Sequence, residues 1–204
     1  MNKIKLISLV VLFGFSVNAF GYGVGWSSYP LKLKERFISA EFTGIFKEGG
    51  GAGVQGRYTH KLYRNFVFDA GAGISGGKRE SRLFAGADYE IFPDYGNQPH
   101  FSVKTTVERA IEFDATTVVI GAAPIVSKGF SFWGKEGYPY FSLPVGLGLN
   151  TDEGTYHTRI NATFGINGPI PVKGYEKLSA NVEAKINLKN TYSGIFLGVS
   201  YPLD

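Results

Sequence analysis

Alternation of apolar and polar side chains is the feature that most constrains this chain. From Arg36 to the last residues, apolar side chains recur at every second position, and clusters of Gly, Pro, Asn and Asp separate the runs. Period two is typical of β-strands, whereas an amphipathic helix repeats at 3.6 residues. The sequence therefore predicts an all-β chain of ten strands, over residues 37–47, 54–62, 66–75, 82–91, 101–108, 115–126, 141–149, 156–166, 178–188 and 191–203.

The composition agrees with one ordered β domain. Aromatic residues make up 15% of the 204 residues, charged residues only 19%, and 28 residues are Gly. A disordered chain would be poor in aromatics and rich in net charge, and the sequence has no collagen triplet or coiled-coil heptad. The chain has no Cys, so no disulfide can stabilise it.

The charge balance excludes nucleic acid as a partner. The whole chain has 21 basic and 17 acidic residues. Without Lys3 and Lys5, which lie in the predicted leader, the count is 19 against 17. The remaining basic residues are scattered among acidic ones and form no patch.

The amino terminus predicts export. Met1 to Lys5 is short and basic, Leu6 to Val17 is an apolar run of 12 residues, and Val17-Asn18-Ala19 has the small-x-small pattern that signal peptidase cleaves. A retained anchor would need about 20 apolar residues. The predicted organisation is a signal peptide at residues 1–19, an N-terminal periplasmic segment at 20–36 and a β-barrel at 37–204.

Strand length and aromatic placement indicate that the apolar face meets lipid. The lengths of the predicted strands suit a tilted transmembrane strand, which needs roughly 9 to 11 residues. Ala and Gly occupy many strand centres, while Tyr and Phe gather near strand ends, as in the aromatic girdles of membrane barrels. The predicted girdle comprises Tyr58, Tyr89, Phe101, Tyr140, Tyr156 and Tyr201.

The opposite face carries charges of both signs, which would converge inside a closed barrel. Closure satisfies every backbone amide between strands, which hydrocarbon requires. Ten strands, or eight if the two weakest segments are dropped, leave a bore just wide enough for side chains to fill. The predicted polar network of the lumen comprises Glu41, Arg57, Arg82, Glu90, Lys104, Glu108, Arg159, Glu183 and Lys185.

Both ends of the chain resemble the small outer-membrane β-barrel proteins of Gram-negative bacteria. The leader Met1–Ala19 is one likeness. The other is the last strand, where Gly194 is followed by Leu197, Val199 and the aromatic Tyr201, although Pro202-Leu203-Asp204 extends beyond it. The resemblance implies an outer-membrane location, contact with outer-membrane lipids, and recognition of the last strand by the barrel-assembly machinery. It assigns no subfamily and no oligomeric state.

The sequence shows no convincing catalytic or metal site. Small barrel lipid hydrolases use a His near a Ser with an acid nearby, but at His157 the required Ser position holds Arg159. His60 falls on the predicted lipid face and His100 in a turn. Without Cys or a His pair at ligand spacing, we predict no metal, no cofactor and no catalytic residue.

These observations predict a structural or narrow-conduit membrane barrel that is not an enzyme. Two other hypotheses stay open. One is a barrel enzyme that modifies lipid A or phospholipid, and the other is a soluble periplasmic lipocalin-like barrel that binds an apolar ligand.

Overall fold

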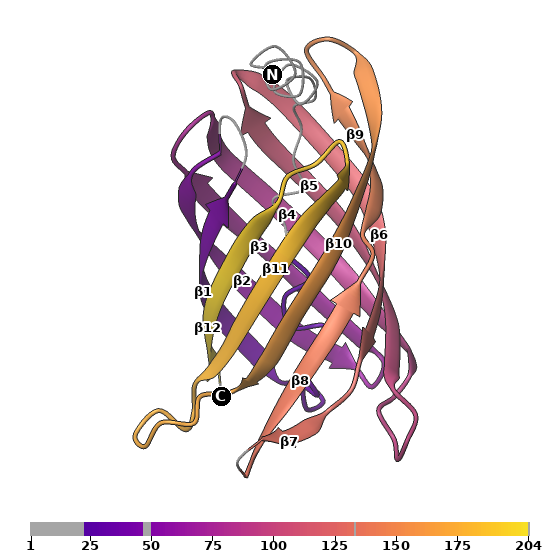
Figure 1. Ribbon diagram of the computed structural model, residues 1–204, viewed down its shortest axis with the longest axis vertical. Coiled ribbons are helices and arrows are strands. Elements are labelled where there is room, and N and C mark those ends of the chain that lie inside the picture. The colour runs from indigo at the N-terminus through magenta and orange to yellow at the C-terminus, as the bar shows by residue number, and fades with distance from the viewer. Residues whose placement is uncertain (1–22, 47–49, 133, 204) are drawn as a thin grey trace, which may run out of the picture.

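The chain forms a closed antiparallel β-barrel (Figure 1). The computed structural model describes residues 23–46, 50–132 and 134–203, so the predicted signal peptide lies outside the described residues. The strands are β1 (Arg36–Ile45), β2 (Ala52–Tyr63), β3 (Phe66–Ser75), β4 (Arg79–Phe92), β5 (His100–Glu112), β6 (Ala115–Ser127), β7 (Phe130–Phe132), β8 (Lys135–Ser142), β9 (Val145–Asn150), β10 (Thr155–Pro169), β11 (Ser179–Lys189) and β12 (Gly194–Leu203).

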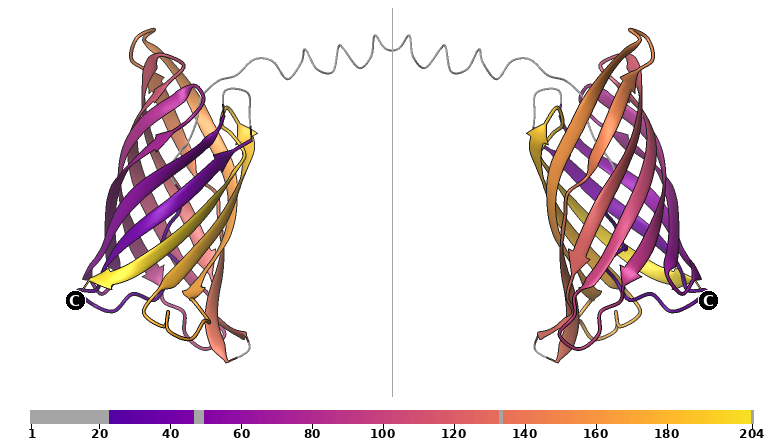
Figure 2. Two further views of the ribbon diagram at one scale, coloured as in Figure 1. Left: turned by 90° about the vertical axis from the view of Figure 1, so that its left-hand side faces the viewer. Right: turned by 90° about the vertical axis from the view of Figure 1, so that its right-hand side faces the viewer.

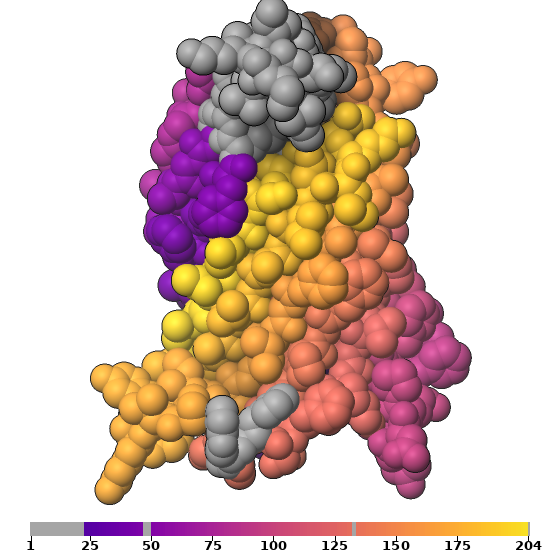
Figure 3. Space-filling model, in the orientation of Figure 1, coloured from indigo at the N-terminus to yellow at the C-terminus, as the bar shows by residue number. Residues whose placement is uncertain are grey.

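Hydrogen bonding runs around the whole circumference. Each strand from β1 to β5 pairs with the next, and β6 pairs with β8 and β9. β8 and β9 both pair with β10, β10 pairs with β11, and β11 pairs with β12. The last strand returns to the first over the register Arg36–Leu203 to Ile45–Gly194. Figure 3 shows β12 and β11 in yellow and orange beside the indigo β1 on one outer surface. The barrel therefore has no open edge.

The prediction of ten strands around the barrel is confirmed, with one refinement. The predicted strand at 141–149 corresponds to two shorter strands, β8 and β9. They lie end to end between β6 and β10 and together take the place of one strand of the barrel. Leu143 and Pro144 separate the two halves, because proline has no N–H for the ladder. The Pro144 carbonyl still accepts a bond from the Asn161 N–H at 3.0 Å. β7 only forms a hairpin with β8.

The connections divide between the two ends of the barrel (Figure 2). One end holds the tight turn at Arg64-Asn65, which the sequence predicted, together with both ends of the barrel chain at Arg36 and Leu203. The other end holds the hairpin between β5 and β6. There Phe113 and Asp114 both have positive φ, of 53° and 64°, as a two-residue type I′ turn requires.

Apolar side chains point outward and polar side chains point inward. Val54, Ile74 and Ile120 are 57%, 64% and 65% exposed, whereas Arg57 and Lys104 are each only 1% exposed. This distribution is the reverse of a soluble protein, in which large apolar side chains are buried and charges face water. A mainly apolar exterior on a closed barrel is the arrangement that spans a lipid bilayer. No helix within the described ranges is long and apolar enough to cross a membrane.

Charge placed at the middle of the outer face tests this orientation. Ile120 lies near the centre of β6, and Ile120→Arg should lower the free energy of unfolding in lipid vesicles by about 2–4 kcal/mol, because the guanidinium would lie in hydrocarbon. Urea titration of the reconstituted barrel measures the change. Tyr95→Arg is the control, since Tyr95 is 82% exposed in the turn after β4. Equal, small effects of both variants would contradict a lipid-facing exterior.

Candidate functional site: the ionic lumen and its mouth

The inner face of the barrel brings together most of the residues predicted as a polar network. Eight of the nine are at most 7% exposed: Glu41, Arg57, Arg82, Lys104, Glu108, Arg159, Glu183 and Lys185. The ninth, Glu90, lies at the mouth of the barrel with a side chain that is 26% exposed. All nine lie on strands, whose alternation turns every second side chain inward.

Arg57 is the centre of the ionic cluster. Its Nε lies 2.6 Å from Glu41 Oε1, and its Nη1 lies 2.9 Å from Asp69 Oδ2. Asp69 also accepts a bond from Lys104 Nζ at 2.6 Å, and Gln55 donates to Glu41. Two cations and two carboxylates thus neutralise one another, which offsets the cost of removing them from water. The predicted network omitted Asp69, although Asp69 lies on the polar face of an alternating strand.

A second cluster lies toward the end with the β5–β6 turn. Arg79 Nη1 lies 3.1 Å from Glu112 Oε1, and the Arg79 guanidinium stacks over the Tyr192 ring at 4.7 Å. Lys185 Nζ lies 5.2 Å from the centroid of Phe196. Cations over aromatic faces add to the stabilisation that ion pairs provide in this buried interior. The predicted network missed Arg79 and Glu112, which lie at strand ends where alternation is harder to assign.

The N-terminal segment occupies the lumen. The Val24 backbone N–H donates to Glu183 Oε2 at 2.8 Å, and the Val24 carbonyl accepts from Lys104 Nζ at 2.7 Å. Asn167 Nδ2 donates to the Gly25 carbonyl at 3.1 Å and to Ser28 Oγ at 2.7 Å. We define residues 23–31 as the plug. That residues 20–36 form a periplasmic segment stays a prediction. The structure shows that the plug, which is part of this segment, lies inside the barrel.

Two plug residues, Trp26 and Gly25, pack closely against side chains of the lumen. Trp26 is fully buried, donates from Nε1 to Ser39 Oγ at 3.1 Å, and packs edge-on against Phe37. Gly25 has a φ of 69°, and a Cβ there would lie 2.5 Å from Arg57 Nη1. Only glycine combines this backbone conformation with that close approach to the guanidinium.

One residue was wrongly assigned to the aromatic girdle. Tyr140 is only 5% exposed, and its hydroxyl donates to Glu183 Oε2 at 2.8 Å, so it belongs to the lumen. The neighbouring Phe141 faces outward, and adjacent strand residues point to opposite faces. The other five residues predicted for the girdle do not face the lumen: Tyr58, Tyr89, Phe101, Tyr156 and Tyr201.

The predicted assembly signal lies on the closing strand. Gly194 is the first residue of β12, and Leu197, Val199 and Tyr201 are 46%, 43% and 43% exposed on its outer face. Their recognition by assembly machinery stays a prediction.

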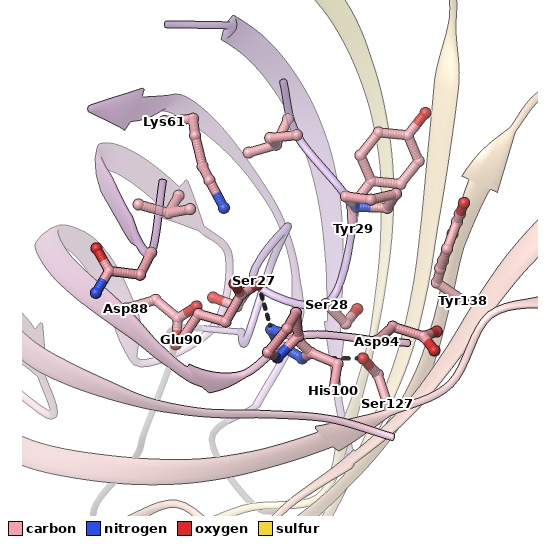
Figure 4. A pocket seen from close by; sticks show the side chains of 15 residues that line it. Ser27, Ser28, Tyr29, Lys61, Asp88, Glu90, Asp94, His100, Ser127 and Tyr138 are labelled. Carbon is pink, nitrogen blue, oxygen red and sulfur yellow. Dashed lines mark hydrogen bonds and ion pairs between the residues drawn. The ribbon is translucent and has the colours of Figure 1, made fainter. Parts of the chain in front are cut away.

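A cavity of about 180 Å³ lies at the mouth where the plug enters (Figure 4). His100 and Ser127 are directly paired across β5 and β6, and His100 Nδ1 lies 3.1 Å from Ser127 Oγ. On the other side, His100 Nε2 lies 3.5 Å from Glu90 Oε2. Ser27 and Ser28 of the plug also line the cavity. The prediction placed His100 in a turn and did not connect it with either neighbour, because the three residues come from three strands.

An ion pair closes the rim of this cavity. Asp94 accepts a bond from Lys128 and another from the Gly129 backbone N–H at 2.7 Å. Burial raises the pKa of the Asp94 carboxyl, but these hydrogen bonds outweigh burial and hold the pKa below its ordinary value of 3.8. Any stabilisation from Asp94 is therefore present above pH 3.8 and lost as the pH falls through the lowered pKa.

The sites considered at His157 and for metals find no support in the geometry. His157 is exposed on β10, and no ion pair or hydrogen bond joins its side chain to another described residue. In the described part of the chain, no group of three or more His, Cys, Asp or Glu side chains could hold a metal ion.

The fold and lumen define a transmembrane β-barrel whose interior is ionic and internally plugged. No family model and no curated protein matches the chain. Among solved structures it is similar to a protein from the de novo design of transmembrane β-barrels, at 13% identity and a TM-score of 0.42 over 85% of this chain and 99% of that one.

Two natural barrels are also similar in structure. KdgM porin matches at 11% identity and a TM-score of 0.40, over 83% of this chain and 99% of the porin. Ail, the attachment invasion locus protein of Yersinia pestis, solved with the heparin analogue sucrose octasulfate, matches at 8% identity and a TM-score of 0.29 over 83% and 97% of the two chains.

The shared carboxylate of the central cluster yields a stability prediction. Asp69→Asn removes the charge that pairs Arg57 and Lys104, and should lower the free energy of unfolding by about 3–5 kcal/mol, because a buried cation loses its partner. Asp94→Asn is the matched control at the partly exposed rim, where about 0–1 kcal/mol is expected. Urea unfolding in vesicles measures both. Similar losses for the two variants would contradict a central cluster that is buried from solvent.

Proposed function

We propose that this chain is an outer-membrane β-barrel of Gram-negative bacteria, exported by a cleaved signal peptide, with a structural role and a sealed lumen. The apolar exterior supports the membrane location, and the predicted leader and last strand support the outer membrane. Outer-membrane lipids and the barrel-assembly machinery are its proposed partners. The observation that carries the sealed lumen is the position of residues 23–31 inside the barrel.

The plug and the ionic side chains both occupy the lumen. Val24, Gly25 and Ser28 each hydrogen-bond to an inward side chain, and the guanidinium of Arg57 is fully buried between two carboxylates. In a barrel of about this size inward side chains occupy much of the bore, and here the plug occupies space that they leave. A narrow conduit is the other form of this function, and it requires the plug to leave the lumen.

Conductance separates a sealed barrel from an open conduit. The mature chain in a planar bilayer should show no steady current, while a variant lacking residues 20–31 should show conductance steps, because the plug and its hydrogen bonds are gone. Deleting residues 172–176, all exposed in the connection between β10 and β11, is the control and should stay closed. Steady conductance of the intact chain would contradict the sealed form.

Thiol reactivity tests whether the plug stays in the lumen, without deleting it. The chain has no Cys, so Ser28→Cys introduces one thiol at a position that is 5% exposed. It should react slowly with a water-soluble maleimide, whereas Leu33→Cys, at a position 59% exposed, should react fast. Equal rates would show that the plug leaves the lumen.

The soluble alternative is disfavoured by the side-chain distribution. A lipocalin-like barrel would need an apolar interior to hold its ligand and a polar surface for water. Here Arg57, Lys104 and Glu183 are buried inside, and Ile74 and Ile120 are exposed outside.

A second candidate function, ester hydrolysis, is favoured by one observation at the mouth. Ser127, His100 and Glu90 form a chain of contacts at 3.1 and 3.5 Å beside a cavity. In such an arrangement the Ser127 hydroxyl oxygen would attack an acyl carbonyl while its proton passes to His100 Nδ1. The proton then goes to the departing alcohol as the ester C–O bond breaks, and water releases the acid. Glu90 would hold the imidazole by accepting from Nε2–H.

An active-site probe tests this candidate. A fluorophosphonate forms a P–O bond with an activated serine and releases fluoride. The hydrolase candidate predicts labelling that Ser127→Ala abolishes and His100→Gln strongly reduces, because the imidazole no longer takes the proton. Ser142→Ala is the matched control, since Ser142 is also an inward serine, 1% exposed. Absence of labelling in the folded wild-type protein removes this candidate.

A further inference from the structure

A groove of about 650 Å³ crosses the outer face of β1 to β4. Its floor is made by the small residues Ala40, Gly56 and Ala72, which are direct neighbours across three strands. Val54 and Ile74 stand beside the floor, 57% and 64% exposed. The groove is therefore an apolar trough on the outer face, with small residues as its floor and larger apolar side chains beside it.

The same row of paired residues ends at a cation. Ala72 pairs with Leu83 on β4, and Leu83 pairs with Arg109 on β5, so the guanidinium side chain borders the groove. Arg109 is exposed on the outer face, three residues before the end of β5. At about 3.4 Å per residue, its backbone lies on the order of 10 Å along the strand from that end, and its long side chain can extend toward the headgroups.

Among the described residues, Arg109 has no counter-charge. No ion pair or hydrogen bond joins its side chain to another residue in ranges 23–46, 50–132 and 134–203. By contrast, the inward cations Arg57, Arg79 and Lys104 all have carboxylate partners. An arginine on a lipid-facing surface is costly toward the bilayer centre, and the cost falls near the headgroups. A phosphate is the anion found at that level, and guanidinium binds phosphate through two parallel hydrogen bonds.

We propose that the groove binds one anionic phospholipid, with an acyl chain in the trough over Gly56 and the phosphate on Arg109. The apolar floor and walls match the acyl chain, and the Arg109 cation at the edge, which pairs with no described residue, matches the headgroup charge. The inference rests on the proposed membrane function, and it adds a specific lipid site to the general contact of a barrel with its bilayer.

Native mass spectrometry of the detergent-purified full mature chain tests the site. Phosphatidylglycerol is the probe, and diacylglycerol with the same acyl chains and inorganic phosphate are compared with it. The wild-type barrel should retain one phosphatidylglycerol but neither comparison compound, because the site needs both phosphate and chain. Retention of inorganic phosphate alone would mean a simple anion site, and equal retention of diacylglycerol would mean an apolar surface without headgroup recognition. Either result overturns the proposal.

Two variants with matched controls locate the site. Arg109→Gln should lower retention roughly ten-fold by removing the charge-assisted bonds, whereas Lys78→Gln changes an exposed cation outside the groove lining and should not. Gly56→Phe should fill the trough and lower retention similarly. A Cβ at Gly56 would meet only the Ser39 carbonyl, at 4.0 Å, so the barrel should still fold. Ala122→Phe, an outward change on β6, is its control.

The two proposals fail in different ways. Equal retention by Arg109→Gln and Lys78→Gln, in barrels that insert normally into vesicles, overturns the lipid site and leaves the membrane function intact. Failure of the wild-type chain to insert into vesicles overturns the membrane function itself.

Discussion

Backbone hydrogen bonding around a complete circle is the constraint on which the rest of this structure depends. Hydrocarbon offers an amide no partner, so a sheet within it cannot have a free edge. β12 supplies the partners of β1 from Arg36–Leu203 to Ile45–Gly194. Once the circle is closed, alternate side chains of every strand must face either lipid or a narrow lumen. The apolar exterior and the ionic interior are therefore two consequences of one closure.

The small circumference explains why the lumen is organised as ion pairs. Charges that project inward from different strands come within contact distance, as Arg57 and Lys104 do at Asp69. Removing such groups from water is costly unless each finds partners. The plug supplies some of them, because its Val24 carbonyl accepts from Lys104 and its Val24 N–H donates to Glu183. The plug is thus part of the lumen's hydrogen bonding, which couples sealing of the barrel to its stability.

Alternation in the sequence was enough to predict the strands, their number and most inward charges. The prediction of which face a side chain occupies failed where a residue was assigned by its type instead of by its position in the alternation. Tyr140 was assigned to the girdle because it is a tyrosine near a strand end, yet the outward position of Phe141 requires Tyr140 to face the lumen. Alternation does place Asp69 on the charged face of β3, and only the final choice of network residues left it out.

The sequence by itself determined the all-β class, the ten strands and the two faces of each strand, because these depend on spacing between neighbours along the chain. Only the tertiary structure decided which side chains meet. The plug has no alternating pattern from which its contact with Glu183 could be predicted. His100, Ser127 and Glu90 come from three different strands, so their contacts could not be predicted from local sequence either. That no described carboxylate pairs with Arg109 can likewise be seen only when all strands are in register. Contacts across strands depend on register and closure, which are non-local properties that no local period encodes.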